Sequence, residues 1–151
     1  MVGVYSVGPL VDHYGLNQPD SDWAHEDKVL NWLDHQLQSS MVFFYFGSLG
    51  SVRGAQLREI AIGLKRTGQR FLLSLRRPEA FESRDYTDLD EVLLNGFLER
   101  TAKTGLIYGW VPHVVILAHK AIGGLVSHCG WNSFMESLWY GVPVATWLVF
   151  G

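Results

Sequence analysis

One segment of the chain predicts a strand, a helix and a second strand in succession: Gly124-Leu-Val-Ser-His-Cys-Gly-Trp-Asn-Ser-Phe-Met-Glu-Ser-Leu-Trp-Tyr-Gly-Val-Pro-Val-Ala-Thr-Trp147. The apolar runs Gly124–Ser127 and Val142–Trp147 are strand candidates, and Phe134–Tyr140 between them is a helix candidate. Two strands joined through a helix lie parallel in one sheet, because the helix carries the chain back to the end where the first strand began. The segment therefore predicts a parallel sheet covered by helices.

Three further strand candidates precede this segment. Met41–Phe46 is a continuous apolar run that ends at Gly47, which is typical of a strand buried on both faces of a parallel sheet. Phe71–Leu75 and Gly105–Tyr108 are the other two. Five strands that alternate with helical patterns predict an α/β fold with a doubly wound parallel sheet.

Two amphipathic helices are predicted, one before the strand Met41–Phe46 and one after it. Their apolar residues recur every three or four positions, so each helix covers one face of the sheet. These residues are Val29, Trp32, Leu33 and Leu37 in a helix that begins at Glu26, and Leu57, Ile60, Ala61 and Leu64 in the other. The polar stretch Arg77–Thr104 is predicted to be a long surface loop with a short helix near Val92–Leu94.

Composition excludes several classes of protein. The 151 residues are 48% hydrophobic and 18% charged, which indicates one globular domain. The formal net charge of −3 gives no overall attraction to nucleic acid or to an anionic membrane. No apolar run approaches the ~18 to 20 residues that span a bilayer, so no membrane segment is expected. The stretch Arg53–Arg77 carries seven cations and one anion, and a solvated helix face is favoured there over a binding patch.

Cysteine and histidine usage argues against disulfide and metal chemistry. The single cysteine, Cys129, excludes an internal disulfide and a cysteine-rich zinc site, and it fits a reducing compartment, with the cytosol as the expected location. The six histidines lack metal-ligand spacing, so no metal site is expected. A nucleophilic Cys129 activated by His128 is disfavoured, because neighbours in an extended chain point to opposite faces.

The ligand site of an open parallel sheet lies beyond the carboxyl ends of its strands, where three loops of this chain carry suitable residues. The first, Gly47–Ser51, offers glycines for close backbone approach and hydroxyls for phosphate, although a plain strand-to-helix turn is favoured there. It is neither Gly-x-Gly-x-x-Gly nor a Walker A loop, which argues against an NAD-type oxidoreductase. The third, Gly109–His113, contains Trp110, which is either a core aromatic or a stacking surface for a base.

The second loop, Ser127–Ser133, opens the predicted helix Phe134–Tyr140. Asn132 and Ser133 stand where a helix N-terminus would hold a phosphate. Glu136 follows Ser133 by three residues, and the local sequence favours a capping box between them; the alternative is a carboxylate that accepts hydrogen bonds from sugar hydroxyls. His128 is either a core histidine or a member of this site.

Taken together, the residues from Trp110-Val-Pro-His113 through Gly124-Leu-Val-Ser-His-Cys-Gly-Trp-Asn-Ser133 to Trp147 closely resemble the signature box of plant family 1 UDP-glycosyltransferases. The resemblance continues upstream through Val7-Gly8-Pro9-Leu10, Trp32-Leu33-Asp34, Phe46-Gly47-Ser48 and Gly96-Phe97-Leu98-Glu99-Arg100. It implies a Rossmann-like sheet that forms part of a GT-B fold. Residues 1–25 would be an interdomain lead-in and residues 26–151 an incomplete C-terminal domain that binds UDP-sugar.

The resemblance also implies roles for individual residues. Trp110 would stack on uracil, and the backbone of Val111 would hydrogen-bond its edge. Glu136 would bind the ribose hydroxyls, and His113 stands where the family usually has a glutamine that contacts the ribose. The diphosphate and sugar would be bordered by Ser48, His128, Gly130, Trp131, Asn132 and Ser133.

The implied function is transfer of a sugar from a UDP-sugar to a hydroxyl of a small molecule, such as a flavonoid or another phenolic. The family's catalytic histidine belongs to the N-terminal acceptor domain, which we expect this chain to lack, so no catalytic residue is assigned here. UDP-sugar would be a co-substrate, and no metal or other cofactor is expected. The alternative is a truncated, non-catalytic nucleotide-binding product.

Overall fold

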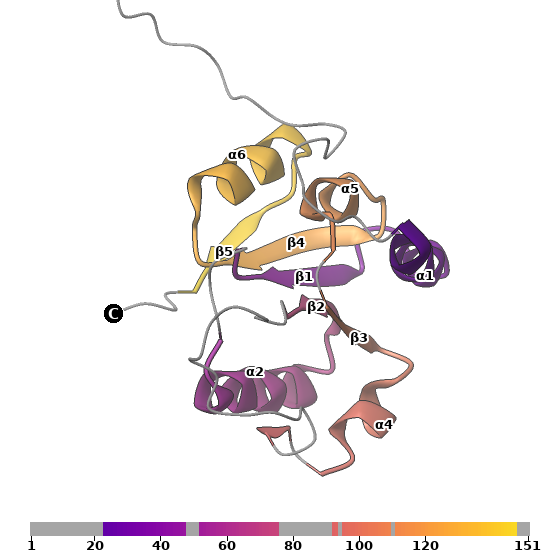
Figure 1. Cartoon of the computed structure of the whole chain (residues 1–151), viewed down its shortest axis with the longest axis vertical. Coiled ribbons are helices and arrows are strands. Elements are labelled where there is room, and N and C mark those ends of the chain that lie inside the picture. Colours follow the sequence, from indigo (N-terminus) through magenta and orange to yellow (C-terminus); the bar gives the residue numbers. More distant parts are fainter. Residues whose placement is uncertain (1–22, 48–51, 76–91, 94, 110, 148–151) are drawn as a thin grey trace, which may run out of the picture.

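The computed structural model describes residues 23–47, 52–75, 92–93, 95–109 and 111–147. Within them, five parallel strands form one sheet in the order β3-β2-β1-β4-β5 (Figure 1). The strands are β1 (Met41–Tyr45), β2 (Arg70–Ser74), β3 (Gly105–Tyr108), β4 (Ile122–Ser127) and β5 (Val144–Thr146). All five strand predictions are confirmed, with small shifts at the ends.

The direction of winding reverses between β1 and β4. From β1 the chain adds β2 and then β3 on one side, after which it crosses back and adds β4 and β5 on the other side. The two strands at the reversal pair directly, with Phe44 opposite Val126 and Tyr45 opposite Ser127. Ligands of doubly wound sheets bind beyond the strand ends at this switch point, so the topology marks the place to look for a site.

Helices cover both faces of the sheet, as a doubly wound fold requires. One face carries α2 (Gly54–Thr67) and α4 (Phe97–Thr101), and the other carries α1 (Trp23–Asp34), α5 (His113–Leu117) and α6 (Trp131–Trp139) (Figure 1). Along β1 the side chains alternate between these layers: Phe44 packs with α2, whereas Phe43 and Tyr45 belong to the cluster on the α1 and α5 side. The buried apolar run of β1 is thereby explained, because both of its faces are covered.

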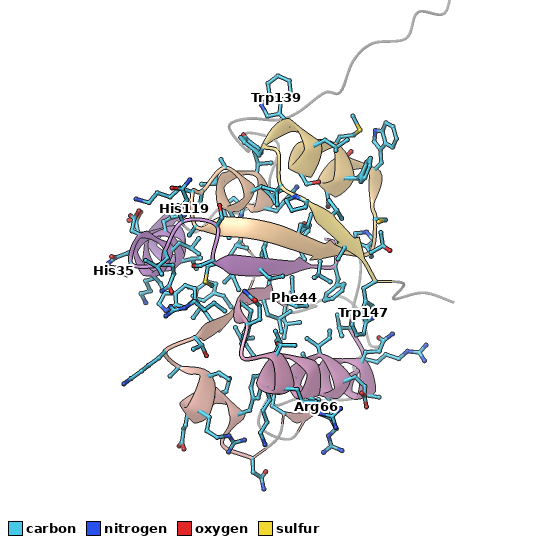
Figure 2. The ribbon with its side chains drawn as sticks, turned by 180° about the vertical axis from the view of Figure 1, so that it is seen from behind. His35, Phe44, Arg66, His119, Trp139 and Trp147 are labelled. Atoms are coloured by element: carbon cyan, nitrogen blue, oxygen red, sulfur yellow. The ribbon has the colours of Figure 1, made fainter. Side chains whose placement is uncertain are left out.

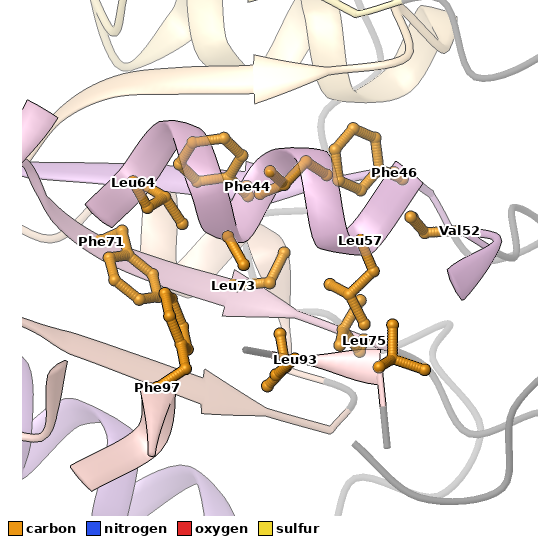
Figure 3. Packing of buried hydrophobic residues seen from close by; sticks show 13 residues of the cluster. Phe44, Phe46, Val52, Leu57, Leu64, Phe71, Leu73, Leu75, Leu93 and Phe97 are labelled. Carbon is orange, nitrogen blue, oxygen red and sulfur yellow. The ribbon is translucent and has the colours of Figure 1, made fainter. Parts of the chain in front are cut away.

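The apolar residues of α2 that the helical spacing predicted to face the sheet are buried there. Leu57, Ile60, Ala61 and Leu64 are all buried against the sheet (Figure 3). On the opposite side of α2, Arg53, Arg58, Lys65 and Arg66 are exposed, and Figure 2 shows Arg66 directed away from the sheet. This confirms a solvated basic face for these four cations, whereas Arg70 is half-buried and donates a hydrogen bond to Gln36 Oε1.

The predicted apolar stripe of α1 is wrong at its end. Val29 and Leu33 are buried, but the helix stops at Asp34 and Leu37 is 73% exposed. The chain leaves the helix through a tight turn in which Ser39 has a φ of 51°, and this turn leads into β1. His119, which follows α5, contacts the last residue of α1. Its Nδ1 accepts a hydrogen bond from the Ala121 amide, and its Nε2 lies 3.3 Å from Asp34 Oδ1.

The prediction of a long surface loop over Arg77–Thr104 is wrong for the part that the structure describes. Val92 and Leu93 are buried in the core beneath α2. Val92 is helical, which agrees with the short helix predicted near Val92–Leu94, and Leu94 lies outside the described residues. Helix α4 was not predicted. Its Phe97 is 2% exposed and packs on Phe71 with 6.2 Å between ring centroids (Figure 3). Val92, Leu93 and Phe97 therefore hold the described part of this stretch against the sheet.

Candidate functional site at the switch point

Three segments that are distant in sequence meet at the carboxyl edge of β1 and β4. Gly47 follows β1, His128 and Gly130 follow β4, and α6 starts at Trp131. The third segment is the start of α5, where His113 follows β3 and stacks on Tyr45, the last residue of β1. The three loops predicted from sequence are therefore brought together in their described parts.

The imidazole of His128 lies between two glycines. A Cβ atom added at Gly47 would stand 2.5 Å from His128 Cε1, and one added at Gly130 would stand 2.6 Å from His128 Nε2. Gly47 also has a φ of +83°, a conformation that other residues adopt at a cost. Glycine at position 47 thus lets the His128 ring approach the first loop closely. The sequence alone did not indicate this contact.

Burial sets the charge state of His128. It lowers the pKa of this imidazole below its ordinary value of 6.5, and a hydrogen bond with the backbone of Tyr45 opposes the shift. His128 is half-buried rather than enclosed. The ring is therefore neutral near pH 7 and lies at the switch point with part of its surface open to solvent.

No described side chain caps the backbone donors in the first turn of α6. Gly130 is the N-cap residue and makes no side-chain hydrogen bond, and the first helical bond runs from the Phe134 amide to the Gly130 carbonyl. The amides of Trp131, Asn132 and Ser133 precede that bond and have no partner within the helix. An uncapped helix N-terminus next to His128 has the donors and the dipole that stabilise an anion.

The capping box proposed for Ser133 and Glu136 is wrong. The helix begins at Trp131, so Ser133 is its third residue and lies inside the first turn. The predicted start at Phe134 was too late, because the aromatic and polar residues before it gave no helical pattern by themselves. Glu136 therefore sits in the second turn, beyond reach of the N-cap, and its carboxylate is available for another role.

Glu136 instead faces His113 across the site. Oε2 of Glu136 lies 2.6 Å from Nε2 of His113, and the two side chains are only 8% and 12% exposed. The His113 ring stacks on Tyr45 with 4.7 Å between centroids and 14° between planes. Oε2 and the second imidazole nitrogen, Nδ1, are buried, and no described group makes a hydrogen bond of regular geometry with either. The buried pair therefore keeps polar atoms that can form further hydrogen bonds.

The remaining predicted site residues differ in how far they are exposed to solvent. Trp131 is 73% exposed, Asn132 is exposed and Ser133 is buried at 5% exposure, all in the first turn of α6. The side chain of Val111 is in the core, which leaves its backbone as the part able to meet a ligand. Ser48 and Trp110 lie outside the described residues.

Sequence reasoning missed Tyr45. It was counted as part of a strand, yet it stacks on His113 and bonds His128 through its backbone, so it touches both halves of the site. Its place as the last residue of a strand at the carboxyl edge was the available signal. Cys129 has a φ of 62°, so the extended geometry that was assumed at this position does not apply, and its amide donates to Ser127 Oγ.

Neither a metal cluster nor a membrane span is found in the described ranges. Among those residues, no three His, Cys, Asp or Glu side chains gather as metal ligands would. None of the helices found there combines the length and the apolar character needed to cross a bilayer. The described part of the switch point presents two imidazoles, a carboxylate and the backbone donors of α6.

Comparison with known proteins shows the family of the chain. Residues 20–151 match the family described as "UDP-glucoronosyl and UDP-glucosyl transferase". The chain is 55% identical over 148 residues to UDP-glycosyltransferase 71K1 of Malus domestica, an alignment that covers 95% of this chain and 31% of that relative. The chain thus spans about a third of the length of such relatives.

Two solved structures have the same fold. A transferase from Siraitia grosvenorii in complex with UDP superposes with a TM-score of 0.84 at 49% identity, over 97% of this chain and 34% of that one. UGT71G1 of Medicago truncatula in complex with UDP-glucose superposes with a TM-score of 0.81 at 49% identity, over 95% of this chain and 29% of that one. The predicted fold class, a Rossmann-like sheet of the kind found in GT-B proteins, is thereby confirmed. The chain belongs to the UDP-glucoronosyl and UDP-glucosyl transferase family, and its switch point lies within the part that matches.

Proposed function

We propose that this chain provides the UDP-sugar-binding part of a UDP-glycosyltransferase that transfers the sugar to a hydroxyl of a small molecule, such as a flavonoid or another phenolic. The observation that carries the proposal is the meeting of His128, the uncapped start of α6 and the buried Glu136 at one switch point. Residues 26–151 would form this part and residues 1–25 the lead-in to it. The single cysteine of the chain fits the cytosol as its compartment.

The diphosphate would lie over the first turn of α6. Backbone amides of this turn and the side chains of Asn132 and Ser133 are suited to phosphate oxygens, with Ser48 as a further contact from the first loop. His128 would gain a proton as the anion approaches, because a negative charge favours the charged imidazole. The relatives in complex with UDP and UDP-glucose support this assignment.

The nucleoside would extend from the diphosphate toward α5. Glu136 would meet the ribose hydroxyls, and His113 beside it completes the polar pair on that side. Trp110 would stack on the uracil, and the backbone of Val111 would bond its edge. Gly130 and Trp131 would border the sugar at the other end of the ligand. These roles rest on the family resemblance together with the positions of the described residues.

The chemistry that these groups support is departure of UDP from the anomeric carbon. As an acceptor oxygen attacks, negative charge grows on the leaving diphosphate, and preorganised donors at the α6 N-terminus with a protonated His128 would stabilise that charge. UDP-sugar enters as a co-substrate. Deprotonation of the acceptor is assigned to no residue described here.

Calorimetric titration of the purified chain with UDP, ADP and uridine tests the proposal. We expect UDP to bind more tightly than ADP, because the base site selects uracil. His128→Asn should weaken UDP by about tenfold or more, as expected for a lost hydrogen bond to a charged group, and leave uridine unchanged. His119→Asn is the matched control, since His119 lies beyond the C-terminal end of α5 and contacts Asp34. This variant should leave UDP affinity unaltered.

The outcomes separate the alternatives. Equal affinity for ADP and UDP, or no binding of either, would contradict the proposed nucleotide site. UDP binding without sugar transfer to a phenolic acceptor would favour the non-catalytic alternative. An equal effect of His128→Asn on UDP and uridine would remove His128 from the diphosphate site while leaving the nucleotide site in place.

A further inference from the structure

We infer that His113 is a positioning residue, which fixes the Glu136 carboxylate so that the site discriminates ligands by their ribose hydroxyls. The inference rests on the proposed function, because it concerns how the same site selects its nucleotide. It differs from a role in which His113 touches the ribose independently. Three observations carry it: the short approach to Glu136, the clamp on Tyr45 and the burial of the second ring nitrogen.

The clamp determines where the imidazole can point. The ring lies nearly parallel to Tyr45, and Tyr45 is itself 5% exposed in the core of the α1 and α5 face. A rotation of the His113 ring would break this stack. His113 also begins α5, directly after Pro112, so the backbone that carries it is restrained as well. Nε2 is thus held toward α6.

Both ring nitrogens are occupied or enclosed in this orientation. Nε2 is 2.6 Å from Oε2 of Glu136, and Nδ1 is buried. The imidazole has no third polar atom. The Glu136 carboxylate has a second oxygen, Oε1, besides the buried Oε2 that faces the imidazole. Glu136 is therefore the member of the pair that keeps a polar atom for a ligand, and His113 supports it.

Without His113, nothing described in the structure would hold the Glu136 carboxylate in its position. Glu136 has three rotatable side-chain bonds, and a carboxyl group buried at this depth needs a polar partner. Among the described residues, His113 is the one ionisable side chain paired with it. Removing the imidazole should let Glu136 turn toward solvent, and hydroxyl recognition should fall although nothing that touches the ligand was changed.

The ratio of two dissociation constants isolates this effect. We would titrate the chain with UDP and with 2′-deoxyuridine 5′-diphosphate, which lacks one ribose hydroxyl. The wild-type chain should prefer UDP by about tenfold or more, because a hydroxyl that donates to a carboxylate gives a strong hydrogen bond. General damage to the site weakens both ligands equally and leaves the ratio unchanged, so the ratio reports on recognition of the 2′-hydroxyl.

Variants then assign the effect to His113. His113→Leu should reduce the preference to within about twofold, and His113→Gln, whose amide still donates toward Glu136, should restore most of it. Glu136→Gln should lower the preference as well, and the double variant His113→Leu with Glu136→Gln should lose no more than either alone, since the two act as one unit. If His113→Leu does not fold, His113→Asn, which is too short to span the gap, takes its place with the same expected ratio.

A wild-type preference that persists in the folded His113→Leu or His113→Asn variant would overturn the inference. Failure of the wild-type chain to discriminate the two ligands while it binds UDP would overturn it too, and would leave the proposed nucleotide site intact. Failure to bind UDP at all would overturn the proposed function and this inference together.

Discussion

Adding one methyl group at Gly47 should displace His128 and impair both stability and nucleotide binding. Three glycines of the chain separate the causes. Gly68 has a φ of +62° with nothing within 4 Å of an added Cβ, so Gly68→Ala tests backbone strain alone. An added Cβ at Gly130, whose φ is −57°, meets His128 and tests the steric conflict alone. Gly47→Ala combines the two effects.

The expected magnitudes follow from these geometries. Left-handed backbone costs a residue with a Cβ about 1 kcal/mol, which sets the expectation for Gly68→Ala. At Gly47 the new Cβ would stand 2.5 Å from His128 Cε1. Carbon atoms pack at ~3.5–4.0 Å, so the ring must move by about 1 Å or more. Overpacking of this kind costs about 1–3 kcal/mol, so Gly130→Ala should lose about that and Gly47→Ala about 2–4 kcal/mol.

Thermal unfolding and calorimetry measure the two consequences. A domain of this size loses about 2–4 °C in Tm for each kcal/mol, so Gly47→Ala should lower Tm about twice as far as Gly68→Ala or more. The displaced imidazole should weaken UDP by about tenfold and leave uridine unaffected. Gly68→Ala should bind UDP like the wild-type chain. If Gly47→Ala matched Gly68→Ala in both Tm and UDP affinity, the placement of His128 between the glycines would be refuted.

Three further predictions concern burial and charge. Leu33→Ala should cost about 2–5 kcal/mol of unfolding free energy because Leu33 is fully buried, whereas Leu37→Ala, at a residue that is 73% exposed, should change it by less than about 0.5 kcal/mol; equal losses would contradict the observed end of α1. Gly123→Ala would place a Cβ on the Ser39 carbonyl and should lower Tm strongly, whereas Gly124→Ala meets nothing closer than 3.9 Å and should be mild; denaturant midpoints would show the reverse order if β4 packed differently. Because burial lowers the pKa of His128, the folded chain binds fewer protons there than the unfolded chain, so this contribution to stability is complete above pH 6.5 and is lost as the pH falls below it. Tm measured between about pH 5 and about pH 7.5 should therefore fall less on acidification in His128→Asn, and an identical slope would contradict the assignment.

Much of the fold was predictable from local pattern. The apolar run of β1 and the spacing of Leu57, Ile60, Ala61 and Leu64 in α2 gave the correct elements, because a strand or a helix repeats its side-chain directions over a few residues. The same reasoning failed at Leu37 and in the polar stretch around Phe97. In both places burial depends on which surface the chain meets, and periodicity does not contain that information.

The candidate site shows the same division between sequence and tertiary structure. The sequence alone determined a doubly wound α/β fold, the loops that carry polar residues and the family that they resemble, since these depend on residues near one another in the chain. Only the tertiary structure decided that Glu136 faces His113, that His128 lies between Gly47 and Gly130, and that Tyr45 joins the two groups. The physical reason is the crossover from β3 to β4, which carries α5 back over the sheet to the end of β1. There α5 meets the ends of β1 and β4, and no local sequence pattern relates these distant segments.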